Sequence, residues 1–261
     1  MVKGLARFRA HFSGYEDAYA LIGGAACDQW FALAGGEFRA TRDLDIVLLV
    51  RATEASFFPR FREFVRAGGY RAGQRAADGR KTFYRFLNPV AKDFPRVIEL
   101  FSAVSVEEAA LSDQRIVPVP TDEGQSSLSA ILLDPDYTEF ILGQREIADG
   151  LPLIKPAGLI LLKVRAWLDL SARRSSGAPA VDEKDIAKHR NDIFRLATLL
   201  PVGEQVRVQP ALTDDLRQFL DSIRADPSVM EAVRQSLASG GLKIPPSALA
   251  DILRQYYEAA P

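Results

Sequence analysis

The order of apolar and polar residues predicts alternating strands and helices in the first half of the chain. The apolar run Tyr19-Ala-Leu-Ile22 ends at Gly23-Gly24, and residues 25–34 then carry apolar side chains at helical spacing. Residues 43–50 read Asp-Leu-Asp-Ile-Val-Leu-Leu-Val, which is the strongest strand pattern in the sequence. Further elements are expected as a helix over 57–67, strands over 81–87 and 97–101, and a strand or a helix over 127–133.

After about residue 150 the pattern becomes helical. A helix is expected over 157–174 after Pro156, a loop over 175–179, and a helix from Asp182 to about Leu200. The sequence therefore predicts an α+β fold, with a mixed sheet and flanking helices in residues 1–150 and a helical domain in residues 151–261. Three shorter helices are expected over 211–225, 227–238 and 246–259.

Composition excludes several classes of protein. The 261 residues are 48% hydrophobic and 26% charged, which excludes a disordered, collagen-like or coiled-coil chain. The single cysteine, Cys27, cannot form an internal disulfide, so a disulfide-stapled secreted scaffold and a Cys-rich zinc site are excluded. The apolar run 159–162 ends at Lys163, and it is far shorter than a membrane span. We therefore expect a cytoplasmic protein with no membrane contact.

Charge is distributed unevenly, although the net charge is only −1. Residues 58–96 contain ten basic and three acidic side chains, whereas residues 99–154 contain eleven acidic and two basic ones. Such a chain has one face suited to polyphosphate or RNA and another that repels them. The alternative, that both stretches are ordinary solvated surface, stays open.

Three carboxylates are the first candidates for chemistry. Asp43 and Asp45 share one face of their predicted strand, which is otherwise apolar on both faces. Burying two like charges costs free energy unless a cation compensates them. Glu99 is the only charge in the strand over 97–101 and joins the pair if the two strands are neighbours. Their spacing suits Mg²⁺ or Mn²⁺, although an exposed strand end and an edge strand remain the alternatives.

Other residues allow a structural or a functional interpretation. The Gly23-Gly24 pair between strand and helix allows a close approach to phosphate, or is only a turn. Lys163 lies inside an apolar helix and is expected to reach a partner or a phosphate, with snorkelling to solvent as the alternative. Asp182 and Asp185 fit a helix cap, and Lys184 and Lys188, one turn apart, can face the same phosphates. His189 lies on the apolar stripe of its helix, which favours a core or domain-interface residue over a catalyst.

In this order the residues resemble a known family. Leu21-Ile-Gly-Gly24, Arg39-Ala-Thr-Arg-Asp-Leu-Asp-Ile46 and Val97-Ile-Glu99 are similar to the nucleotidyltransferase fold of the DNA polymerase β superfamily. More narrowly they resemble the AbiEii-type nucleotidyltransferases, some of which are toxins of type IV toxin–antitoxin systems. The resemblance extends to Lys163 and to Asp182-Glu-Lys-Asp185, and so covers residues 19–200. One departure is the eighteen residues between Gly24 and Asp43, with 34–38 as the expected insertion.

The resemblance implies a Mg²⁺-dependent transferase that moves a nucleoside monophosphate from an NTP to an acceptor hydroxyl. The acceptor is tRNA, another RNA or a protein, and a cognate antitoxin is a further partner. A small-molecule nucleotidyltransferase of the aminoglycoside type, or a non-catalytic nucleotide-binding regulator of the same fold, are the alternatives. The residues implied are Asp43, Asp45 and Glu99 for metal and catalysis, Lys163 and Asp185 for catalysis, and Gly23, Gly24, Arg42, Lys163 and Lys184 for the nucleotide.

Overall fold

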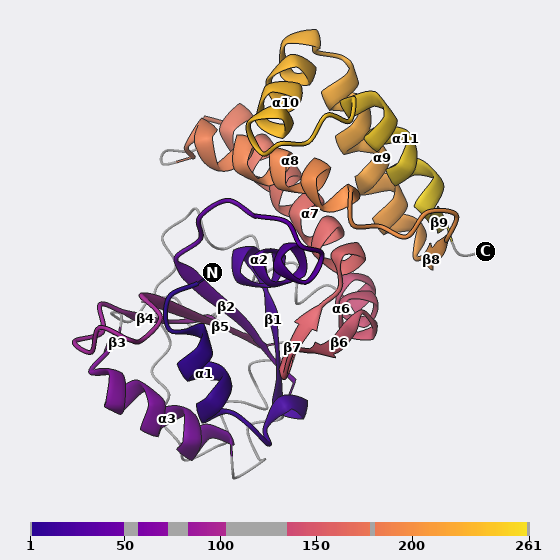
Figure 1. Cartoon of the computed structure of the whole chain (residues 1–261). Coiled ribbons are helices and arrows are strands. Elements are labelled where there is room, and N and C mark those ends of the chain that lie inside the picture. The colour runs from indigo at the N-terminus through magenta and orange to yellow at the C-terminus, as the bar shows by residue number, and fades with distance from the viewer. Residues whose placement is uncertain (1, 50–56, 73–82, 103–134, 178–180, 260–261) are drawn as a thin grey trace.

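The computed structural model describes residues 2–49, 57–72, 83–102, 135–177 and 181–259. Within these ranges the protein has a mixed sheet with flanking helices followed by a group of helices (Figure 1), which confirms the α+β class. No helix among these residues is long and apolar enough to cross a membrane.

The sheet contains seven strands in the described residues, in the order β3-β4-β5-β2-β1-β7-β6. At its centre β1 (Tyr19–Ile22) runs antiparallel to β2 (Asp43–Leu48), and β2 runs parallel to β5 (Val97–Ser102). The register places Asp45 opposite Glu99, so the two acidic strands are neighbours as expected. The outer strands are β3 (Arg71–Ala72) and β4 (Phe83–Leu87) beyond β5, and β7 (Leu151–Ile154) and β6 (Arg145–Ala148) beyond β1.

The hairpin of β6 and β7 was not expected from the sequence. Strands of four residues are too short to show a clear alternating pattern, and Pro152 has no N–H to donate to a neighbouring strand. β7 nevertheless pairs with β1 inside the sheet, so the sheet extends past residue 150 to Ile154. The segment expected over 127–133 lies outside the described residues.

Aromatic side chains pack two helices against the sheet. The ring of Phe8 lies 5.5 Å from Phe64 and 5.5 Å from Tyr19 of β1, all measured between ring centroids. His11 Nε2 also makes a 3.0 Å hydrogen bond with the carbonyl oxygen of Arg60, so the two helices lie side by side (Figure 1). These helices are α1 (Leu5–His11), which the sequence analysis did not predict, and α3 (Phe57–Gly68), which it did. A short 3-10 helix (Glu16–Ala18) precedes β1.

Helix α7 (Pro156–Ser175) joins the two parts of the molecule. It contacts α2 (Gly23–Leu33), which follows β1 directly, and it also packs on α8 (Glu183–Ala197) and α9 (Pro210–Arg224). Tyr257 Oη donates a 2.7 Å hydrogen bond to the carbonyl oxygen of Ala157, which fixes the end of the chain to the start of α7. The remaining elements are α6 (Pro135–Gly143), α10 (Pro227–Ser239), α11 (Pro246–Tyr256), β8 (Val206–Val208) and β9 (Tyr257–Ala259).

Candidate functional site

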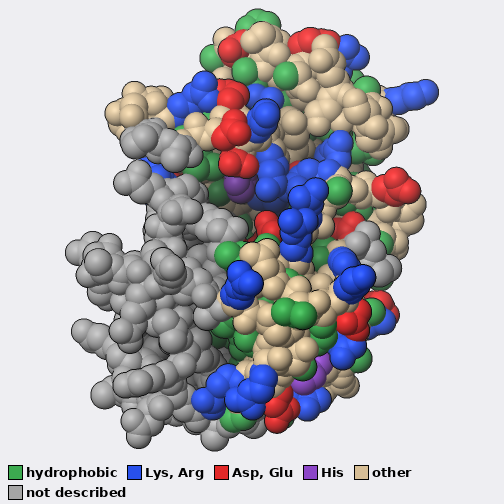
Figure 2. Space-filling view, turned by 90° about the vertical axis from the view of Figure 1, so that its left-hand side faces the viewer, with side chains coloured by type: hydrophobic (Ala, Val, Ile, Leu, Met, Phe, Trp, Pro, Cys, Tyr) green, Lys and Arg blue, Asp and Glu red, His purple; other side chains and the backbone are tan. Residues whose placement is uncertain are grey.

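A cleft of about 520 Å³, open solvent included, lies where the sheet meets α7 and α8. Both parts of the molecule contribute side chains to it, so the cleft exists only when the two are packed together. On the face shown in Figure 2, Lys and Arg side chains gather between the upper helices and the lower sheet part. The cleft is lined by Gly23, Gly24, Arg39, Thr41, Asp43 and Asp45 from the sheet part, and by Leu159, Leu162, Lys163, Lys188 and His189 from α7 and α8.

Three acidic side chains lie close together here, and two of them, Asp43 and Asp45, line the cleft whereas Glu99 does not. Asp43 and Asp45 both line it, because β2 presents alternate residues to the same side. Glu99 is buried on the neighbouring strand and shares a side-chain hydrogen bond with Asp45. A hydrogen bond between two carboxyl groups needs a proton on one of them. Burial, and then the negative charge of Asp43, raise the pKa of Asp45 to about 6.

The positions of Asp43, Asp45 and Glu99 show whether they already form a complete cation site. In the part of the chain that the structure describes, no three His, Cys, Asp or Glu side chains form a ready-made metal-binding group. Asp45 and Glu99 are hydrogen-bonded to each other, and Asp43 acts on Asp45 through its charge. The acids are thus crowded, and a proton relieves part of their repulsion.

The two glycines allow side chains to lie against the start of α2. A Cβ atom on Gly23, whose φ is +63°, would lie 1.7 Å from Asp45 Oδ2. A Cβ atom on Gly24 would lie 2.4 Å from Thr41 Oγ1. Any side chain at these positions would therefore displace residues that line the cleft. Glycine is thus needed here for packing, whether or not a phosphate approaches the backbone as expected.

A buried ion network lies beside the acids. Lys163 Nζ donates to Asp192 Oδ2 at 2.9 Å, while Arg39 Nε donates to Oδ1 at 2.8 Å and Arg39 Nη2 donates to Oδ2 at 2.6 Å. Asp192 is only 1% exposed. Burial alone would raise the pKa of Asp192, but Lys163 and Arg39 outweigh burial and lower it to about 2. Lys163 therefore has a protein partner, one of the two outcomes expected for it, while it also lines the cleft.

His189 lies in the wall of the cleft, on the same helix as Asp192. Its Nδ1 atom is buried and has no hydrogen-bond partner among the described residues. Burial, and then the positive charge of Lys163, lower the pKa of His189 to about 3. The imidazole is therefore neutral at pH 7 and offers a hydrogen-bonding group rather than a charge.

Three residues implied by the resemblance lie elsewhere. Arg42, Lys184 and Asp185 are exposed and do not line the cleft. Asp182 caps α8, because its Oδ1 accepts a 2.9 Å hydrogen bond from the backbone N–H of Lys184. The geometry thus accounts for Asp182 through capping.

Sequence reasoning missed three residues of this region, which are Arg39, Thr41 and Asp192, whereas Lys188 was expected, with Lys184, to face phosphates. A signal existed for Asp192, because it stands beside Ile193 on the buried side of α8, where a charge needs a partner. The chain shows no match to any family model and no significant match to a curated protein.

Proposed function

We propose that the protein is a metal-dependent nucleotidyltransferase that moves a nucleoside monophosphate from an NTP to an acceptor hydroxyl in this cleft. The observation that carries the proposal is the opposition of acids and cations across one cleft. Asp43 and Asp45 stand on the sheet side, and Lys163 and Lys188 stand on the helical side. Acids suit divalent cations and lysines suit phosphates, and a nucleotide–metal complex needs both.

The acidic wall fits a divalent cation in its chemistry. Carboxylate oxygens are the protein ligands that Mg²⁺ and Mn²⁺ prefer, and Asp43, Asp45 and Glu99 would hold the ion. The raised pKa of Asp45 supports this role, because the crowding that favours binding of a proton would also favour binding of a cation. When bound, the ion supplies charge stabilisation on the phosphate oxygens that bear the developing negative charge.

The other wall fits a triphosphate. Lys188 is exposed and has no ion-pair partner among the described residues, so its ammonium group is available to a phosphate oxygen. Lys163 and Arg39 share one carboxylate, so their network keeps one positive charge in excess beside the cleft. The first amides of α2 add a further anion-binding element near Gly23 and Gly24.

The reaction itself is a displacement at the α-phosphorus. The acceptor oxygen forms the new P–O bond, the bond to the bridging oxygen breaks, and pyrophosphate leaves with the electron pair. The proton of the acceptor hydroxyl passes to the Glu99 carboxylate in this scheme. Lys163 and Lys188 offset the charge on the leaving pyrophosphate.

The acceptor follows only from the family resemblance and from charge. We propose RNA, and tRNA in particular, or a protein, since the basic stretch over 58–96 would attract a polyanion. By the same resemblance the protein is a candidate toxin with a cognate antitoxin, acting in the cytoplasm.

The test incubates the purified protein with each α-labelled NTP, Mg²⁺ and total RNA or cell lysate. Labelled RNA or protein is expected with the wild type, and Asp43→Asn and Asp45→Asn are each expected to abolish labelling. Asp251→Asn, an exposed aspartate on α11, is the matched control and should label normally. Label on small molecules alone would identify the aminoglycoside-type alternative. If the wild-type protein does not bind NTP in the presence of Mg²⁺, the proposal is refuted. If it binds NTP but transfers no label, the protein is a regulator.

A further inference from the structure

A second pocket, of about 980 Å³ with open solvent included, is lined by other residues of α2 and α7, two of the helices that line the cleft. Helix α2 brings Gly23 to the cleft and Trp30 to the pocket, and α7 brings Lys163 to the cleft and Pro156 to the pocket. The two sets of lining residues have no member in common. The pocket is therefore a separate site, and its size suits a small organic molecule.

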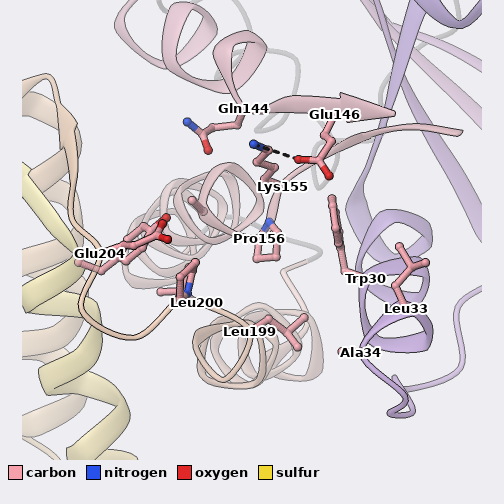
Figure 3. Close-up of a pocket in the computed structure, with 13 residues that line it drawn as sticks. Trp30, Leu33, Ala34, Gln144, Glu146, Lys155, Pro156, Leu199, Leu200 and Glu204 are labelled. Carbon is pink, nitrogen blue, oxygen red and sulfur yellow. Dashed lines mark ion pairs between the residues drawn. The ribbon is translucent and has the colours of Figure 1, made fainter. Parts of the chain in front are cut away.

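The floor of the pocket is apolar and its rim is polar. Figure 3 shows Pro156 and Leu200 in the middle of the pocket and Trp30 at one side. Glu146 and Glu204 lie on opposite sides of these apolar residues (Figure 3). A ligand that covers the floor therefore reaches a carboxylate at the rim.

The charges of the rim are not balanced. Lys155 Nζ lies 3.0 Å from Glu146 Oε2, so these two side chains neutralise each other. Glu204 is exposed, and no cation pairs with it among the described residues. Burial, and then the negative charge of Glu204, raise the pKa of Tyr256, another residue of the lining. The pocket thus carries one unbalanced negative charge, whereas the cleft offers Lys188 to an anion.

An aromatic ring is held in place at the side of the pocket opposite Glu204 (Figure 3). Trp30 Nε1 donates a 2.8 Å hydrogen bond to the carbonyl oxygen of Ile154, so the indole N–H is already used. The indole can then offer a ligand only its apolar ring surface. An apolar surface for the body of a ligand, with a carboxylate at the far edge for its ammonium group, suits an organic ammonium ion.

We infer that this pocket binds a small organic cation, with its ammonium group at Glu204 and its apolar body on Trp30, Pro156 and Leu200. The inference does not depend on the proposed nucleotidyl transfer, because it concerns another site with its own ligand. A phosphate ester is a poor ligand here, because Glu204 repels it.

The test measures binding of three probes of similar shape by titration calorimetry and ligand-observed NMR. These are 2-phenylethylammonium, 2-phenylethanol and 3-phenylpropionate, which are cationic, neutral and anionic. One rim ion pair is worth up to about 1 kcal/mol, so we expect the cation to bind about fivefold tighter than the alcohol. The anion should bind most weakly. Equal affinities for all three probes, or no binding of the cation up to about 10 mM, would overturn the inference.

Variants locate the binding. Glu204→Gln should reduce the affinity for the cation to that for the alcohol, while Glu231→Gln on α10 should leave it unchanged. The acids of the cleft are a competing site for an ammonium ion, and Asp45→Asn tests for binding there. This variant should also leave the affinity for the cation unchanged. Loss of cation binding in Asp45→Asn, or its retention at full strength in Glu204→Gln, would contradict the assignment. Trp30→Ala should weaken all three probes, and Glu204→Gln keeps the test decisive if that variant fails to fold.

Discussion

Two clusters of charged side chains lie beside each other at the cleft. In one a buried carboxylate is paired with cations, and in the other a buried carboxylate is crowded by further acids. Asp192 is hydrogen-bonded to Lys163 and Arg39, so the buried anion has both of its oxygens satisfied. Asp45 stands among acids, and burial together with the charge of Asp43 raises its pKa to about 6. The first cluster is complete without a ligand and holds the sheet part to the helical part. In the second, burial and the charge of Asp43 outweigh the opposing effect of Lys163 and Lys188 on the pKa of Asp45, and such a perturbed group in a cleft is typical of a binding site.

The largest expected difference between the clusters is in stability. Asp192→Ala leaves the buried ammonium of Lys163 unpaired, so the free energy of unfolding should fall by about 3–5 kcal/mol. Asp45→Asn removes one of several crowded acids and should leave stability at pH 7 unchanged or higher. Urea denaturation measures both. Asp214→Ala, which removes an exposed ion pair with Arg217, is the matched control and should cost at most about 1 kcal/mol. Equal losses from Asp192→Ala and Asp214→Ala would contradict the comparison.

The two clusters should also respond to pH in opposite directions. The pKa of Asp45 is raised from 3.8 to about 6, so the folded state binds its proton more tightly than the unfolded state does. Its contribution to stability is present below pH 4 and is lost as pH rises through 6. The pKa of Asp192 is lowered to about 2, so its contribution is present above pH 4 and is lost as pH falls through 2. Each change is on the order of 2–3 kcal/mol.

Urea titrations at a series of pH values measure these changes. Asp45→Asn should remove the decrease in the free energy of unfolding as pH rises from 4 to 6. The same variant should keep the decrease that occurs as pH falls below 4. Saturating Mg²⁺ should also remove the upper decline, since a bound cation takes the place of the proton. An upper decline that persists in Asp45→Asn would show that another group causes it.

Gly23 offers a narrower test of how the acids are placed. Gly23→Ala and Gly35→Ala both force alanine into left-handed backbone, at φ +63° and +73°, and each should cost about 1–2 kcal/mol. Only the Cβ atom at Gly23 meets the carboxylate of Asp45, because nothing lies within 4 Å of a Cβ atom at Gly35. Gly23→Ala alone should therefore lower Mg²⁺-dependent transfer, on the order of tenfold to a hundredfold. Equal transfer rates in the two variants would mean that the position of Asp45 does not matter.

The acidic cluster could be predicted from sequence, whereas the ion network could not. Asp43, Asp45 and Glu99 stand out because each is a charge in an apolar strand, and the alternation of a strand fixes which side chains share a face. Arg39 and Asp192 are 153 residues apart and meet only because the loop after α2 reaches α8. No local pattern encodes such a contact. Lys163 was singled out correctly as a lysine needing a partner, but the partner could only be identified in the fold.

The fold shows the same division. The strand of Asp43, the helix after Pro156 and the helix after Asp182 were predicted, because long patterns and helix caps are local signals. The hairpin of β6 and β7 was missed, because β7 is held in the sheet by pairing with β1, which lies more than a hundred residues earlier in the chain. Tertiary pairing outweighed the local preference of Pro152.

The smallest expected effect separates two lysines one turn apart on α8. Lys188 lines the cleft and Lys184 does not, although the family resemblance had pointed to Lys184. An exposed lysine that contacts one phosphate contributes about 1 kcal/mol, so Lys188→Ala should raise the KM for NTP about three- to tenfold with little change in kcat. Lys184→Ala should have a smaller effect, and Lys243→Ala measures the general effect of losing a surface charge. If Lys184→Ala has the larger effect, the triphosphate lies nearer the start of α8 than the cleft does, and the acids and cations compared here do not face the same ligand.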